Sequence, residues 1–187
     1  MTPMPLPTIL FVNGSLGGNT GNTAELFAIG EESLIGEAKV THLELARQPS
    51  LDRVLAACDE ADGFVFGTGT YWDSWGSPLQ LFLEQTAHTE GDDIWLGKPL
   101  GVVVTAHAVG AKGIVSSLFG VLNVYGMQIP PFAGIAYTFS NEVALPHAND
   151  HLRNELWKAD DVAVVCHNVV EMARGGSDWM QIGRAHV

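Results

Sequence analysis

Hydrophobic residues in this chain gather into short uninterrupted runs, and each run predicts a strand. Apolar runs without polar alternation are typical of the central strands of a parallel sheet that helices cover on both faces. Residues 38–45 alternate apolar and polar residues imperfectly, as a strand near a sheet edge would. The expected strands lie at residues 8–13, 38–45, 64–66 and 100–104, with a fifth region formed by residues 127–129 and 134–137.

Between these runs, apolar residues recur at the spacing of one helical face and predict amphipathic helices. The polar stretch 140–149 is expected to be a loop. Regular alternation of strands and helices predicts an α/β fold, in which a parallel sheet carries helices on both faces. The predicted helices cover residues 24–37, 51–58, 79–87, 113–125 and 150–174.

The composition favours one globular domain. The chain has 187 residues, of which 47% are hydrophobic and 16% are charged, so it is long enough to bury a core and too short for two ordinary domains. The longest apolar runs, such as Leu100–Val104, are too short to cross a bilayer. Nine Lys and Arg against 21 Asp and Glu give a net charge of −12, which opposes binding to nucleic acid and to anionic membranes.

The amino-terminal residues and the cysteines bear on the compartment. Residues 1–7 lack the basic region and long apolar core of a secretory signal, and Cys58 and Cys166 fall in predicted helices without metal-like spacing. A reducing cytoplasm is therefore the expected location. The histidines show no ligand spacing either, so no metal site is expected.

The last seven residues, 181–187, look foreign to the rest of the chain. Their sequence back-translates without a mismatch to cag atc gga aga gca cac gtc, which resembles a widely used sequencing adapter. We expect that the reading frame runs off a DNA fragment here, and a genuine short tail is the alternative. Gly175 and Gly176 already provide a helix stop after Arg174. We therefore expect a single domain over residues 1–176 and a tail over residues 177–187.

Residues 14–23 join the first strand to the first helix and are rich in glycine and small polar residues. A helix start offers unpaired N–H groups and the positive end of the helix dipole, glycines let the backbone close around a ligand, and hydroxyl groups add donors. This segment therefore predicts a phosphate site built on Ser15, Thr20, Asn22 and Thr23. The alternative is that Asn22, with Glu25 three residues later, merely caps the helix.

Two better-known phosphate loops do not fit this segment. A nucleotide-triphosphate loop ends in Gly-Lys-Ser or Gly-Lys-Thr, but no lysine occurs between Met1 and Gly36. The dinucleotide fingerprint Gly-x-Gly-x-x-Gly fails at Leu16, where its second glycine should stand. The remaining lysine-free pattern resembles the Thr-Gly-Asn-Thr phosphate loop of flavodoxins and flavodoxin-like FMN reductases.

Two further unusual loops follow the third and fourth strands. Residues 67–78 contain Tyr71, Trp72 and Trp75, and residues 105–110 contain glycine and histidine. The carboxyl ends of parallel strands share one edge of the sheet, where ligands bind at the topological switch point. Together the three loops suit a molecule with a phosphate and a flat ring.

Around the third loop, residues 61–86 resemble the flavodoxin-fold NAD(P)H-dependent FMN reductase family. The family pattern is ADG-x-x-F-G-[ST]-P-x-Y-W, and residues 61–72 of this chain read ADGFVFGTGTYW. Gly97–Pro99 before the next strand and Leu122–Met127 at a helix end resemble further landmarks of that family. The resemblance covers residues 8–137 or so. It implies a flavodoxin-like three-layer sandwich, in which a five-stranded parallel sheet of order 2-1-3-4-5 carries helices on both faces.

The resemblance also implies FMN as cofactor and NADH or NADPH as electron donor. No catalytic residue is assigned with certainty, because the hard chemistry belongs to the cofactor. His107 is a candidate, and the alternative is a loop histidine without chemistry. Carried over residue by residue, the FMN phosphate would be held by Ser15, Gly21, Asn22 and Thr23. The isoalloxazine ring would be bordered by Thr68, Gly69, Thr70, Tyr71, Trp72 and Asp73, and its other side closed by Thr105, Ala106, His107 and Gly110.

The chain departs from the family pattern at two places. Gly17 stands where the family often has a basic residue, which weakens the electrostatic hold on phosphate or NADPH. Gly69 stands where the family has a proline, which loosens the ring loop. Residues 47–52 lack the cysteine cluster of iron–sulfur relatives, so no cluster is expected. The alternative for the aromatic residues of the third loop is that they cover a hydrophobic surface or a subunit contact.

These observations lead to the hypothesis of an FMN-dependent oxidoreductase that transfers hydride from NAD(P)H through bound flavin to a quinone or another small acceptor. One alternative is a flavodoxin-like electron carrier that docks a redox protein through its acidic surface, to which the charge of −12 is suited. Another is a flavin-binding regulatory protein without turnover. The resemblance further implies a homodimer or homotetramer with the flavin near the interface.

Overall fold

A computed structural model of the chain describes residues 5–149, 151, 153 and 156–180. At its centre is one parallel sheet with the strand order β2-β1-β3-β4-β5, so the expected order is confirmed. The imperfectly alternating segment is β2, which lies at the edge of the sheet as predicted. The strands are β1 (Thr8–Asn13), β2 (Lys39–Glu44), β3 (Gly63–Gly69), β4 (Leu100–Ala106) and β5 (Gly134–Thr138).

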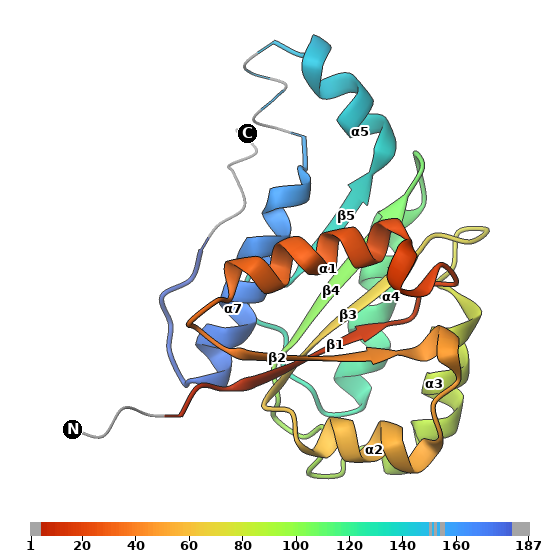
Figure 1. Cartoon of the computed structure of the whole chain (residues 1–187), viewed down its shortest axis with the longest axis vertical. Coiled ribbons are helices and arrows are strands. Elements are labelled where there is room, and N and C mark those ends of the chain that lie inside the picture. The colour runs from red at the N-terminus through yellow and green to blue at the C-terminus, as the bar shows by residue number, and fades with distance from the viewer. Residues whose placement is uncertain (1–4, 150, 152, 154–155, 181–187) are drawn as a thin grey trace.

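Helices cover both faces of this sheet, which gives the molecule three layers (Figure 1). On one face, α1 (Asn22–Ser33) and α7 (Val162–Ala173) pack against each other and against β3 and β4. The other face carries α2 (Leu51–Asp59), α3 (Ser77–Thr86) and α4 (Ala111–Val124). The predicted three-layer arrangement is therefore confirmed.

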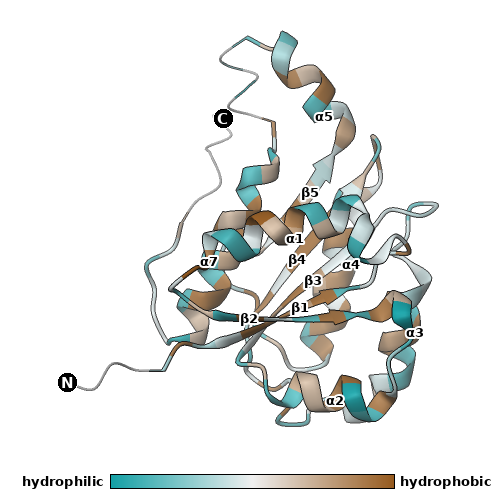
Figure 2. Cartoon of the chain, viewed as in Figure 1, coloured by the Kyte–Doolittle hydropathy of each residue, from teal (hydrophilic) through white to brown (hydrophobic). Residues whose placement is uncertain are grey.

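Each face of the sheet has its own hydrophobic core, because successive side chains of a strand point to opposite sides. In β1, Ile9 and Phe11 pack with α1 and α7, whereas Leu10 and Val12 pack with the helices of the opposite face. Hydrophobic colour runs along the central strands in Figure 2. All residues of β3 and β4 are buried, which explains why both segments are apolar or small without alternation.

Two predictions for the last third of the chain were wrong. The stretch 140–149 is not a plain loop, because it contains most of α5 (Phe139–Ala144) and a 3-10 turn at Leu145–His147. No residue of α5 is buried, and the helix has only 6 residues, fewer than the window in which a helical period of apolar residues is read. The final helix begins at Val162, and the start of the predicted helix at residue 150 falls partly outside the described residues.

A short capped turn explains why the final helix begins late. Residues 156–158 are not helical, and a 3-10 turn at Ala159–Asp161 precedes α7. The Lys158 N–H donates to Asp161 Oδ2 at 2.8 Å. In a continuous helix this N–H would donate to a backbone carbonyl four residues earlier, so its bond to a side chain is typical of a helix start.

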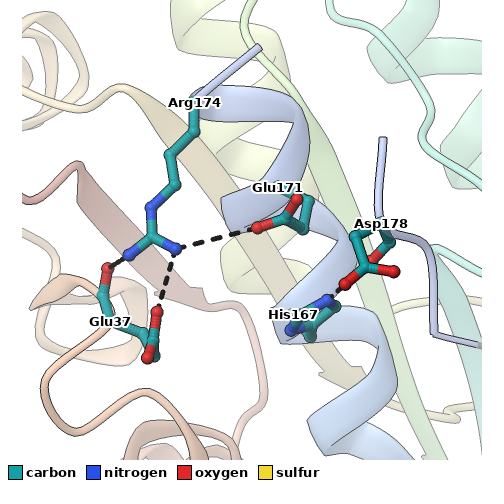
Figure 3. Close-up of polar contacts among 5 residues, drawn as sticks. All are labelled: Glu37, His167, Glu171, Arg174 and Asp178. Atoms are coloured by element: carbon teal, nitrogen blue, oxygen red, sulfur yellow. Dashed lines mark hydrogen bonds and ion pairs between the residues drawn. The ribbon is translucent and has the colours of Figure 1, made fainter. Parts of the chain in front are cut away.

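Polar contacts hold the C-terminal end of α7 at the amino edge of the sheet (Figure 3). Arg174 Nη1 lies 2.9 Å from Glu37 Oε2, and His167 Nε2 lies 2.9 Å from the carbonyl oxygen of Asp178. The buried Asn168 side chain accepts the Met180 N–H and donates to the Met180 carbonyl, both at 2.9 Å. Residues 177–180 therefore lie against α7, although the sequence predicted a tail from residue 177. The suspected adapter segment, residues 181–187, lies outside the described residues.

Candidate cofactor-binding site

Three loops meet at the carboxyl edge of the sheet, where β1 stands between β2 and β3 and the strand order reverses. We define loop 1 as residues 14–21, loop 3 as residues 70–76 and loop 4 as residues 107–110. A Cβ atom on Gly76 would lie 2.5 Å from the Gly14 carbonyl oxygen, and one on Gly110 would lie 2.4 Å from Asp73 Oδ1. Loop 3 therefore touches both of the other loops. This is the switch point at which ligands bind in doubly wound sheets.

Loop 1 is shaped by Asn13, a residue that the sequence analysis did not select. Asn13 is buried at the end of β1, its Oδ1 accepts the Ser15 N–H at 3.0 Å, and its Nδ2 donates to the Gly18 carbonyl at 2.9 Å. The Gly17 N–H donates to Ser15 Oγ at 3.2 Å. These bonds curl the loop around the Ser15 hydroxyl. A polar residue that ends an otherwise apolar strand was the available signal for Asn13.

The amino terminus of α1 carries no side-chain cap. The N-cap residue is Gly21, and Asn22 is already the first helical residue, so the alternative in which Asn22 merely caps the helix is wrong. In the described part of the chain, no acceptor is recorded for the N–H groups of Asn22 and Thr23. These groups, with the positive end of the helix dipole, favour an anion in front of loop 1.

Thr23 differs from the other predicted phosphate residues in its orientation. Its hydroxyl lies 3.3 Å from Thr105 Oγ1, and both side chains are buried. Its methyl group packs on β3, where a Cβ on Gly67 would lie 2.6 Å from Thr23 Cγ2. The Thr23 hydroxyl therefore bonds between α1 and β4, while Ser15, Gly21 and Asn22 lie around the mouth of loop 1.

Loop 3 leaves β3 through a tight two-residue turn. Tyr71 and Ser74 exchange backbone bonds of 2.8 and 3.0 Å, and the two residues between them, Trp72 and Asp73, have φ values of 51° and 59°. Two left-handed residues in sequence define a type I′ turn, which is strained for a bulky side chain such as tryptophan. Trp72 is fully exposed at the tip of this turn. Thr68 Oγ1 accepts the Gly76 N–H at 2.9 Å and so closes the base of the loop.

The side chain of Thr70 lies where loop 3 meets loop 4. Its N–H donates to the Thr105 carbonyl at 2.7 Å, but its Oγ1 is buried and has no hydrogen-bond partner in the described part of the chain. Its methyl carbon is 3.2 Å from the position of a Cβ on Gly110. A buried hydroxyl without a partner costs free energy, so a ligand group or an ordered water beside it would stabilise the site.

The predicted site residues between Thr105 and Gly110 lie partly at the end of β4 and partly in loop 4. Thr105 and Ala106 are buried as the last residues of β4, whereas His107 is exposed and its carbonyl accepts the Ser140 N–H at 3.0 Å. Gly110 has a φ of 91°, a left-handed conformation that favours glycine, and it is the N-cap of α4. The structure thus brings the predicted residues of loops 1, 3 and 4 to one edge, and it buries Thr23, Thr68 and Thr105 beneath them.

Glu44 is a charged residue that contacts loop 1. Glu44 Oε1 accepts the Asn19 N–H at 2.9 Å, and Glu44 Oε2 pairs with Arg47 at 2.5 Å. Loops 1, 3 and 4 contain no lysine or arginine. An anion at loop 1 would therefore be held by neutral donors. A cavity of about 520 Å³ adjoins loop 1 between α1 and β2, and its lining includes Asn19 of loop 1, Phe27 and His42.

The described residues hold no cluster of three or more histidine, cysteine, aspartate or glutamate side chains that could bind a metal ion. No helix in the described part of the chain is long and apolar enough to span a membrane.

Comparison with known proteins gives a family for the chain. A family model described as NADPH-dependent FMN reductase matches residues 7–142. The comparison with curated proteins found no match.

Solved structures with the same fold include several flavoproteins. RosB with a bound riboflavin-5′-phosphate derivative aligns with a TM-score of 0.71 at 14% identity, over 90% of this chain and 79% of that one. A flavodoxin-like WrbA-like protein from Agrobacterium tumefaciens aligns with a TM-score of 0.64 at 16% identity, over 91% and 98%. The NAD(P)H:acceptor oxidoreductase FerB from Paracoccus denitrificans gives a TM-score of 0.62 at 16% identity, over 91% and 98%. These likenesses confirm the flavodoxin-like fold.

Proposed function

The chain belongs to the NADPH-dependent FMN reductase family, and from this premise we propose that it transfers hydride from NADH or NADPH through FMN to a quinone or another small acceptor. Membership of the family gives FMN as the flavin and a nicotinamide nucleotide as the electron donor. The observation that carries the placement of FMN is the uncapped amino terminus of α1 behind Ser15, at the switch point of the sheet.

The donors of loop 1 fit the phosphate of FMN. The Ser15 hydroxyl and the N–H groups of Asn22 and Thr23 lie at the mouth of loop 1 and the start of α1. Hydrogen bonds to a charged group contribute roughly 1.5–3 kcal/mol each, so a few neutral donors can replace a lysine. Thr23 contributes to the phosphate through its N–H in this proposal, because its hydroxyl is bonded to Thr105.

Loops 3 and 4 fit the flavin ring. The unpartnered Thr70 hydroxyl lies between them, and a polar edge of the isoalloxazine would give it a partner. The absence of a side chain at Gly110 lets Asp73 and Thr70 of loop 3 lie directly against loop 4. A hollow of about 450 Å³ adjoins Gly110 and is lined by Val109, Lys112 and Trp157 among others, which supports this side as the approach for the nucleotide or the acceptor.

The roles of the protein groups are binding and orientation. Bound FMN would supply the two-electron chemistry, so no dedicated general base is needed. Ser15 and the start of α1 fix the phosphate, and this fixes the position of the ring against loops 3 and 4. Asp73 and Gly110 keep loops 3 and 4 in contact. His107 is exposed at the start of loop 4, and we retain it as a candidate residue beside the ring.

The tips of the three loops are apolar and exposed. Leu16 is 54% exposed, Trp72 101% and Val109 76%. Such a rim supports the proposal that the protein works as a homodimer or homotetramer with the flavin near the interface, because exposed apolar patches mark interaction sites. We also propose a cytoplasmic location, which agrees with two buried cysteines that form no disulfide.

The experiment starts from purified protein that is incubated with FMN and washed. We expect flavin absorption in the protein fraction, and steady-state oxidation of NADH or NADPH with menadione as acceptor. Gly120→Ala on α4 is a suitable control variant, because this residue lies outside the three loops and nothing lies within 4 Å of its added Cβ. Bound FMN without turnover of either nucleotide would contradict the enzyme and favour an electron carrier. Failure to bind any flavin would contradict the proposed site itself.

A further inference from the structure

The side chain of Tyr71 crosses from loop 3 to loop 1. Its hydroxyl oxygen lies 3.1 Å from the Leu16 nitrogen and 3.3 Å from Ser15 Oγ. The resemblance to known reductases placed Tyr71 beside the flavin ring, but these contacts place its hydroxyl beside the predicted phosphate site. Trp72, the next residue, points into solvent, so the two aromatic residues of this turn have different roles.

A count of hydrogens shows what the Ser15 and Tyr71 pair can do. The Leu16 N–H can only donate, so the Tyr71 oxygen accepts it, and Ser15 Oγ accepts the Gly17 N–H in the same way. The two hydroxyls together carry two hydrogens, and one of these lies in the bond between them, whichever oxygen donates. One O–H is therefore left over. Neither oxygen has a recorded acceptor for it in the described part of the chain.

Two glycines beside the Tyr71 ring explain how its hydroxyl reaches Ser15. A Cβ on Gly69 would lie 3.1 Å from the Tyr71 ring and hydroxyl, and one on Gly76 would lie 3.2 Å from the ring. Both positions are glycine, so the ring can lie against the backbone of its own loop and extend toward Ser15. Gly69 is one of the two departures from the family pattern, and here the missing side chain gives the ring its space.

Gly17 is the second position at which the chain departs from the family pattern, so loop 1 has no basic residue there. On the basis of the proposed function, we propose that Tyr71 belongs to the phosphate site: its hydroxyl and that of Ser15 act as one unit that donates the spare O–H to the FMN phosphate. The Leu16 and Gly17 N–H groups polarise this unit by donating to its two oxygens. A neutral donor from loop 3 thus replaces the absent cation, and the protein selects FMN over riboflavin.

The test is Tyr71→Phe, which keeps the ring and removes only the hydroxyl. Flavin-fluorescence titration should show FMN binding weakened by about tenfold or more, equivalent to about 1.4 kcal/mol, while riboflavin affinity changes less than about threefold. The control is Trp72→Phe on the same turn, for which no hydrogen bond of the indole is recorded among the described residues. It should leave the ratio of FMN to riboflavin affinity unchanged.

Three results would overturn this assignment. Equal weakening of both flavins would give Tyr71 a structural role only, and no change would remove it from the site. Tighter FMN binding by the variant would mean that the tyrosine competes with phosphate for the Leu16 N–H. Wild-type protein that binds neither flavin would instead contradict the proposed function, so the two failures are distinguishable.

Discussion

Ser15 and Thr23 are both hydroxyl residues next to the start of α1, and the structure separates their roles. Ser15 Oγ belongs to the hydrogen-bonded loop in front of the helix, whereas the Thr23 hydroxyl bonds to Thr105 beneath it. The sequence suggested that loss of either hydroxyl would weaken the hold on phosphate. The geometry supports this expectation for Ser15. For Thr23 it predicts instead that loss of the hydroxyl affects stability and not the hold on phosphate.

We predict that Ser15→Ala weakens FMN binding by roughly tenfold, about 1.4 kcal/mol, and that riboflavin binding changes little. Thr23→Val, which keeps the shape of the side chain, should leave the ratio of the two affinities unchanged. It should lower the free energy of unfolding by about 1 kcal/mol, because the buried Thr105 hydroxyl loses its partner. Flavin-fluorescence titration and urea denaturation measure these effects. A selective loss of FMN binding in Thr23→Val would show that its hydroxyl turns toward the phosphate.

At the scale of elements, the position of α1 depends on a close approach to β3. A Cβ on Gly67 would lie 2.5 Å from the Phe27 ring and 2.6 Å from Thr23 Cγ2. Real Cβ atoms do not approach other atoms so closely, so a side chain at Gly67 would force Phe27, Thr23 or the helix that carries them to shift. Since the proposed phosphate site lies at the start of α1, we expect the packing of this helix and the binding of the cofactor to be coupled.

We predict that Gly67→Ala lowers the free energy of unfolding by roughly 1–3 kcal/mol through overpacking, and that it weakens FMN and riboflavin binding together. Gly120→Ala on α4 is the matched control, because nothing lies within 4 Å of its added Cβ. This exposed helical position should gain up to about 1 kcal/mol from the higher helix propensity of alanine. Denaturant titration of both variants checks the signs. Equal stability of Gly67→Ala and wild type would mean that α1 is not packed tightly on β3.

At the scale of the whole molecule, the burial of cysteine and tyrosine side chains makes the free energy of unfolding depend on pH in the alkaline range. Burial raises the pKa of the Cys58 and Cys166 thiols from 9.0 to about 12, and burial together with Glu142 raises the pKa of Tyr137 to about 12. Each group is neutral when protonated, so the folded protein keeps protons that the unfolded chain releases above pH 9. Lys98 acts in the opposite direction, because burial lowers its pKa.

We predict that stability is nearly constant up to about pH 9 and falls between pH 9 and pH 12. The unfolded state binds fewer protons in that window, and the slope approaches about 1.4 kcal/mol per pH unit for each fully buried thiol. Urea denaturation from pH 7 to pH 11 measures the decline. Cys166→Ala should make it shallower, although the variant starts from lower stability because it leaves a cavity. Stability that stays flat to pH 11 would contradict the burial of both thiols.

The sequence by itself determined the class of fold, the order of the strands through its family resemblance, and the loop in which we propose the phosphate site. Uniform apolar runs mark buried strands locally, and the glycines and hydroxyl residues of 14–23 mark an anion site locally. Helix α5 was missed because its 6 residues are too few to show a helical period of apolar positions.

Only the tertiary structure decided which hydroxyl faces which partner. Tyr71 meets Ser15 across 56 positions of sequence, and Thr23 meets Thr105 across 82. The role of Asn13 in shaping loop 1 follows only from the two hydrogen bonds that its side-chain amide makes in the folded protein. The physical reason is that hydrogen bonds depend on distances of about 3 Å and on direction, and these are set by the packing of strands and helices that lie far apart in the chain.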